Sequence, residues 1–99
     1  MSRKRLDPIP PGEILREEFM RPLGITVSGL AREIGVPANR ISQIVNGKRA
    51  FSADTALRLG KYFGMSPEIW LDLQSEYELR LARQTTWKHV EPRVRTRVA

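Results

Sequence analysis

Apolar residues recur at intervals of three and four along most of the chain, which is the spacing of an amphipathic helix. No segment alternates apolar and polar residues as a half-buried strand does. Proline and glycine interrupt the pattern repeatedly, so the elements between them are short. The sequence therefore predicts an all-α chain of five helices, at about residues 12–20, 27–34, 37–45, 53–63 and 67–83.

Residues that favour helix ends stand at the borders of these segments. Thr26 and Ser52 are suitable N-caps, because their hydroxyl groups can accept a hydrogen bond from the first turn. Gly35 is expected to end the second helix in the left-handed conformation, which costs glycine little. The segment from Pro22 to Gly24 is expected to stop the first helix near residue 20, and Ser66 is expected to cap the fifth. The fourth helix is predicted to turn the following residues inward: Ala53, Ala56, Leu57, Gly60 and Phe63.

The segment from Thr26 to Arg49 joins two short helices through one tight turn. A helix-turn-helix needs a small residue where the helices cross, and Ala31 supplies it. It also needs apolar side chains in the angle between the helices, which Val36 and Ile41 provide. In such a motif the N-terminal turn of the second helix projects into the major groove of DNA. The sequence therefore predicts a helix-turn-helix whose reading helix starts at about Pro37.

Polar and basic side chains occupy the exposed face of that reading helix and the loop after it. Between residues 36 and 50 there are three cations and no carboxylate. Asn and Gln pair with adenine, Arg pairs with guanine, and Ala can touch the methyl group of thymine. Asn39, Arg40 and Gln43 are expected at base edges, with Lys48 and Arg49 at phosphates. The alternative is a solvated helix face followed by a basic loop. The candidate DNA-binding residues are Ala38, Asn39, Arg40, Ser42, Gln43, Asn46, Lys48 and Arg49.

Composition is compatible with this interpretation. Seventeen Lys and Arg against eleven Asp and Glu give a net charge of +6, which makes a polyanion a plausible partner. Charge retained for solubility would explain the same excess. Ninety-nine residues, 40% of them apolar, fit one globular domain with short tails. The chain has no cysteine, no apolar run of roughly 18 residues and no apolar stretch behind its basic N-terminus. We therefore expect a cytoplasmic protein without a membrane span.

Catalytic and metal-binding patterns are missing from the sequence. The single histidine, His89, has neither a cysteine nor a second histidine near it, and is interpreted as a solvated side chain. There is no glycine-rich phosphate loop, serine elbow or HExxH motif. We expect no enzymatic activity, no cofactor and no metal.

The fifth helix carries aromatic and aliphatic residues at helical spacing, together with an acidic stretch. Its acidic character indicates that it faces away from DNA, so its aromatic residues are core or dimer contacts rather than a base-stacking platform. Leu79 and Leu81 stay apolar beyond the expected edge of the domain, which favours a two-fold dimer over simple surface exposure. The candidate dimer residues are Trp70, Leu73, Tyr77 and Leu81.

The termini differ from the helical domain at residues 11–83. Residues 1–10 form a basic, proline-rich arm, with three cations between Ser2 and Arg5. Residues 84–99 lose the helical periodicity and are predicted to be a mobile basic tail. Either tail could add phosphate contacts, and the C-terminal one could instead wrap an acidic partner; a solvated tail without a role is the remaining interpretation.

At the helix-turn-helix residues the chain resembles the XRE group of repressors, which includes the phage lambda-type repressors. Val27 stands where many members carry a glutamine that anchors the DNA backbone. Pro37 replaces their usual hydroxyl cap, so the reading helix is expected to begin without one. The resemblance implies a lambda-repressor-like DNA-binding fold. The matching positions are Leu30-Ala31, Ile34-Gly35-Val36, Ile41-Ser42, Ile44 and Asn46-Gly47-Lys48-Arg49.

The flanking segments are similar to those of the HigA-type antitoxins. This resemblance implies a dimer that represses its own operon from an inverted-repeat operator and neutralises a RelE-like mRNA-cleaving toxin. Two alternatives stay open: a solitary phage-type regulator without a toxin, and a protein-interaction module that kept the fold. A toxin-like reading frame beside the gene would separate the first two. The matching segments are Pro10–Leu15, Glu17–Phe19, Pro22–Gly24, Ala53–Leu59, Phe63-Gly64 and Ser66–Leu71.

Overall fold

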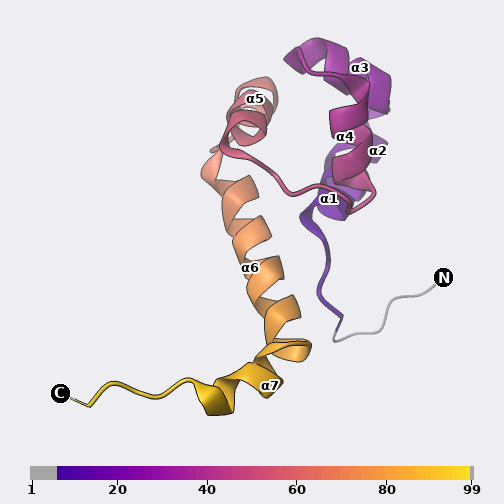
Figure 1. Ribbon diagram of the computed structural model, residues 1–99. Helices are drawn as coiled ribbons and strands as arrows, with labels where there is room; N and C mark the ends of the chain where they lie inside the picture. Colours follow the sequence, from indigo (N-terminus) through magenta and orange to yellow (C-terminus); the bar gives the residue numbers. More distant parts are fainter. Residues whose placement is uncertain (1–6, 99) are drawn as a thin grey trace.

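The computed structural model describes residues 7–98, and all regular secondary structure in that part is helical (Figure 1). The α-helices are α1 (Pro11–Ile14), α2 (Arg21–Leu23), α3 (Val27–Ile34), α4 (Ala38–Val45), α5 (Ala53–Phe63), α6 (Glu68–Gln84) and α7 (Trp87–Val90). A π-helical segment, η1 (Leu15–Met20), connects α1 to α2, and a 3₁₀ turn, η2 (Glu91–Arg93), follows α7. The all-α prediction is confirmed. No helix in this part of the chain is long and apolar enough to cross a bilayer.

The first helical segment is longer than predicted. It runs without interruption through α1, η1 and α2 to Leu23, whereas the sequence suggested an end near residue 20. Pro22 lies inside this continuous run, directly after the π-helical segment, and the helical turn continues past it to Leu23. The segment ends at Gly24, whose φ of 65° is left-handed. The glycine therefore stops the helix and the proline does not.

The caps around α3 and α5 have the expected chemistry. The Thr26 hydroxyl accepts a hydrogen bond from the Gly29 amide at 3.0 Å. Ser52 does the same for the Thr55 amide at 3.2 Å. Gly35 ends α3 with a φ of 74°. These cap predictions are confirmed.

The starts of α4 and α6 lack a hydroxyl cap. Pro37 precedes α4 in extended conformation, and no side chain caps this helix, as predicted; the helix itself begins one residue later, at Ala38. Ser66 was predicted to cap α6, and this is wrong: α6 has no side-chain cap hydrogen bond. The Ser66 hydroxyl instead donates a hydrogen bond to the Glu68 carboxylate.

The core lies between the helix-turn-helix and the start of α6. Trp70 is fully buried there, with the rings of Phe19 and Phe51 each centred 5.0 Å from its own. The sequence offered a core or a dimer contact for Trp70: the core position is confirmed, and the dimer role is wrong, because the folded chain itself covers the whole side chain. The buried apolar residues are Leu15, Met20, Leu30, Ala31, Ile34, Ile41, Ile44, Val45, Phe51, Ala56, Leu59 and Trp70.

Helix α5 is rotated relative to the prediction. Leu57, expected to face inward, is 62% exposed, and Ala53 is exposed as well. Thr55 and Leu59 are buried in their place. The polar Thr55 tolerates burial because its hydroxyl accepts a hydrogen bond from Ser52 at 3.2 Å.

The C-terminal region contains more structure than expected. Helix α6 ends at Gln84, and the Thr85 hydroxyl donates to the Leu81 carbonyl at 2.7 Å. The predicted loss of helical periodicity over residues 84–99 is wrong for α7 and η2, where short-range backbone hydrogen bonds close further turns. Side chains of residues 84–98 are exposed. The predicted basic arm between Ser2 and Arg5 lies outside the described residues.

Candidate nucleic-acid interface

Helices α3 and α4 pack together across the turn at Gly35 and form the predicted helix-turn-helix. Ala31 is 2% exposed at the crossing of the two helices, and Ile41 is fully buried behind it. Val36 in the turn packs against the same core, and its amide donates to the Ala31 carbonyl at 3.0 Å. The small and apolar residues singled out in the sequence thus fix the angle between the helices.

The other end of α4 is held by the first helical segment. Gly12 of α1 lies so close that a Cβ atom placed on it would be 1.7 Å from the Ile44 carbonyl oxygen. The Arg16 guanidinium reaches the Val45 carbonyl at 3.5 Å. Helix α4 is therefore supported by α3 along its side and by the N-terminal segment at its C-terminal end.

The predicted DNA-binding side chains lie along α4 and the loop that follows it. Residues 38, 39, 42, 43 and 46 fall on one side of the helix by their spacing, opposite the buried Ile41, Ile44 and Val45. Arg40, Ser42 and Gln43 are half-buried. The exposed members of the set are Ala38, Asn39, Asn46, Lys48 and Arg49.

Arg40 has a tertiary partner that sequence reasoning missed. Its Nη1 lies 2.7 Å from Oδ2 of Asp54, on the first turn of α5. The same carboxylate oxygen is 2.9 Å from Nε of Arg58. Hydrogen bonds from Arg58, and then from Arg40, lower the pKa of Asp54. The i,i+4 spacing of Asp54 and Arg58 is visible in the sequence, whereas the fourteen-residue separation of Arg40 and Asp54 carries no such signal.

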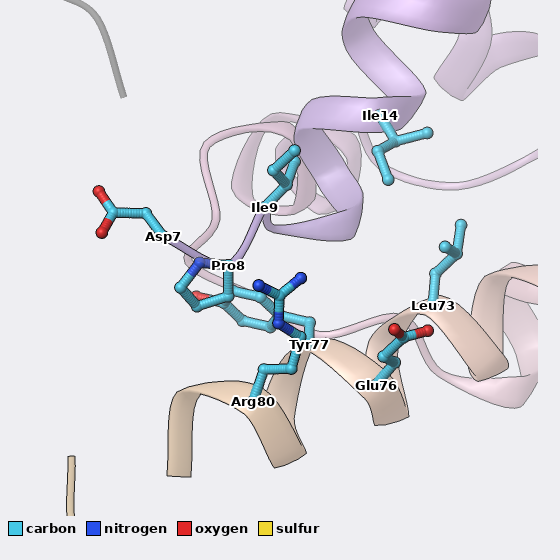
Figure 2. Close-up of a pocket in the computed structure, with 8 residues that line it drawn as sticks. All are labelled: Asp7, Pro8, Ile9, Ile14, Leu73, Glu76, Tyr77 and Arg80. Carbon is cyan, nitrogen blue, oxygen red and sulfur yellow. The ribbon is translucent and has the colours of Figure 1, made fainter. Parts of the chain in front are cut away.

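The predicted dimer residues of α6 are placed differently from one another. Leu73 and Tyr77 are half-buried and line a groove of about 230 Å³ between α6, Ile14 of α1 and the segment before it. Figure 2 shows Ile9 of that segment near α1, on the side of the groove opposite α6, and Pro8 overlapping the ring of Tyr77 in this view. Leu81, beyond the groove, is 39% exposed. With Trp70 buried, Leu81 is the member of this set that offers an open surface.

Known proteins share the sequence and the fold of this chain. A family model described as helix-turn-helix matches residues 15–70. Virulence-associated protein I of Dichelobacter nodosus is 44% identical over 84% of this chain and 77% of its own length. Antitoxin HigA-1 of Vibrio cholerae is 36% identical over 93% of this chain and 90% of its own. The Pseudomonas aeruginosa antitoxin HigA, solved with the higBA promoter, superposes with a TM-score of 0.86. That structure shares 43% identity and covers 92% of this chain and 99% of its own.

Proposed function

This chain belongs to the helix-turn-helix family and, within it, to the HigA group, and from that premise we propose that it binds operator DNA through α4 and represses transcription there. The observation that carries the proposal is the surface of α4: a polar and basic face, free of carboxylates from residue 36 to 50, on a helix packed against α1 and α3. The relative solved with its promoter has the same fold over 92% of the chain. This role needs no cofactor or catalysis, and it places the protein with the DNA in the cytoplasm.

The side chains divide by what they can reach. Asn39 and Gln43 present amides, and Arg40 a guanidinium, to the base edges of the major groove. Lys48 and Arg49 follow the helix and neutralise phosphates on its flank. The remaining predicted contacts are Ala38, Ser42 and Asn46.

Replacing Gln43 with Ala tests whether α4 reads sequence. The change should cost about 1–3 kcal/mol on the specific site and leave binding to random DNA nearly unchanged. The measurement is the affinity of each variant for a duplex selected by the wild-type protein from a random-sequence pool, and for its scrambled version. Lys48→Ala is the contrasting variant: it should weaken both duplexes alike and reduce the salt dependence by about one counterion. Equal losses on both duplexes for Gln43→Ala would contradict base reading by this residue.

A second role, neutralisation of a RelE-like toxin, is supported by the Vibrio cholerae relative, which is named an antitoxin and matches over 93% of this chain. Under this proposal the reading frame beside the gene encodes the toxin. Expressed alone, its product should arrest bacterial growth, and co-expression with this chain should restore growth and yield a complex that co-purifies. A harmless neighbour that does not bind this chain would favour the solitary phage-type regulator. Binding of a protein without measurable binding of any DNA would favour the interaction module.

A further inference from the structure

Arg58 anchors a network of hydrogen bonds that ends on α4, the recognition helix that we propose to read DNA. Its Nη1 donates to the carbonyl oxygens of Ile34 at 2.8 Å and Gly35 at 3.1 Å, the last turn of α3 and its cap. Its Nε donates to Oδ2 of Asp54, and that oxygen also accepts from Arg40. Backbone groups of the turn thus fix Arg58, Arg58 fixes the carboxylate, and the carboxylate fixes the side chain of Arg40.

We propose that Asp54 is a positioning residue for sequence discrimination: it holds Arg40 of α4 in one orientation, so that this arginine makes a single defined contact with operator DNA. The inference rests on the proposed function, because it concerns how the same interface tells one DNA sequence from another. Asp54 stands outside the recognition helix and is not itself placed at a base.

The geometry leaves Arg40 able to bind DNA while it is held. A guanidinium has five N–H donors, and the contact with Asp54 engages Nη1. The Arg40 side chain is 29% exposed, so part of it remains open to a ligand. An arginine that is already ordered loses less conformational freedom when it binds, and its planar fork needs a fixed direction to recognise a base or a phosphate bidentately.

The charge of Asp54 acts in the same sense. An open recess beside α4 is lined by three arginines, Arg40, Arg49 and Arg58, and by the carboxylate of Asp54. Without the carboxylate, these three arginines would attract any phosphate backbone more strongly. Arg40 would then be free to turn toward a phosphate of any DNA sequence. The acid therefore reduces indiscriminate attraction to DNA as well as directing one side chain.

The experiment measures the ratio of affinities for the selected duplex and its scrambled version, using the full chain. Asp54→Asn should lower this ratio about tenfold, the discrimination attached to one base contact, mainly by strengthening binding to the scrambled duplex. Asp72→Asn on α6 is the matched control: it removes the same charge from an exposed position outside the helix-turn-helix and should leave the ratio unchanged. Asp54→Glu, which keeps the carboxylate, should retain most of the ratio.

A double-mutant cycle shows whether the effect passes through Arg40. In an Arg40→Ala background, Asp54→Asn should no longer lower the ratio, because the side chain that it positions is gone. Repeating the selection with Asp54→Asn should relax the preference at one base position in each half-site and leave the others intact. A merely structural role would weaken all positions together, and circular dichroism would show the accompanying loss of helix.

Four results would overturn the inference. An unchanged ratio in Asp54→Asn would show that the carboxylate does not contribute to discrimination. An equal fall in Asp72→Asn would assign the effect to net charge. An equal fall in the Arg40→Ala background would show that the effect does not pass through Arg40. A wild-type chain that binds both duplexes equally would overturn the proposed function together with the inference, whereas the first three results would leave the proposed function standing.

Discussion

Gly12 lies at the point where the first helix touches the backbone of the recognition helix. An added Cβ would be 1.7 Å from the Ile44 carbonyl oxygen and 2.6 Å from its carbon. A flexible side chain could move out of the way, but these are backbone atoms in the last turn of α4. Any larger residue must therefore push α1 and α4 apart and open the core between them.

Gly12→Ala should lower the free energy of unfolding by about 3 kcal/mol, the upper part of the range for overpacked sites. Urea denaturation followed by circular dichroism measures the change. Gly24→Ala provides the comparison: nothing lies within 4 Å of its added Cβ, so it reports only the strain of a φ of 65°, about 1 kcal/mol. A loss for Gly12→Ala no larger than for Gly24→Ala would refute the close approach of α1 to α4.

Among the elements, α3 and α4 are each only eight residues long. Helices of this length are marginal in isolation, so their stability depends on packing and on how their ends are satisfied. Helix α4 has no side-chain cap, and α3 relies on the hydroxyl of Thr26. The cap of α3 therefore contributes to the placement of the whole motif.

Thr26→Ala should destabilise the protein by about 1 kcal/mol, because the Gly29 amide would lose its acceptor. Thermal unfolding measures this loss of stability. Thr26→Asn should retain most of the wild-type stability, since asparagine caps equally well. Ser28→Ala, an exposed change in the same turn, is expected to be neutral or slightly stabilising, because alanine favours a helix. If Thr26→Ala proves as harmless as Ser28→Ala, the cap contributes nothing measurable.

At the scale of the whole molecule, the long helix α6 contributes to an elongated shape. The radius of gyration is 16.3 Å, against about 13 Å for a compact chain of 100 residues. The C-terminal part of α6 and α7 stand away from the helix-turn-helix (Figure 1). Leu79, Leu81, Trp87 and Val90 in this region are 38–51% exposed. A second copy covering them would form the two-fold dimer expected from the sequence.

Leu81→Asp should therefore convert a dimer into a monomer in sedimentation equilibrium at micromolar concentration. Footprinting of the wild-type protein should show two inverted half-sites about one helical turn, ~10 bp, apart, and the variant should protect them only at higher concentration. Leu23→Asp, at a leucine 65% exposed on α2, should leave the dimer intact. A wild-type protein that sediments as a monomer and protects a single half-site would refute the dimer.

The sequence by itself determined the features that depend on close neighbours along the chain. The hydroxyl of Thr26 caps the helix that starts beside it, and Gly35 takes the left-handed conformation that the turn requires. The 3.6-residue spacing assigned Ile41 to the buried side of α4 and Asn39 to the exposed side. Caps, turns and helix faces involve residues one to four positions apart, so they can be inferred without tertiary contacts.

Only the tertiary structure decided which apolar residues are covered and which charges meet. Leu57 and Trp70 are both apolar residues at helical spacing, but the packing of α5 and α6 buries Trp70 and leaves Leu57 exposed. Likewise, no local rule joins Arg40 to Asp54, fourteen residues away, until α5 lies beside the recognition helix. Burial and long-range ion pairing depend on how distant elements are placed in space, and a periodic pattern leaves the rotation of each helix against its neighbours undetermined.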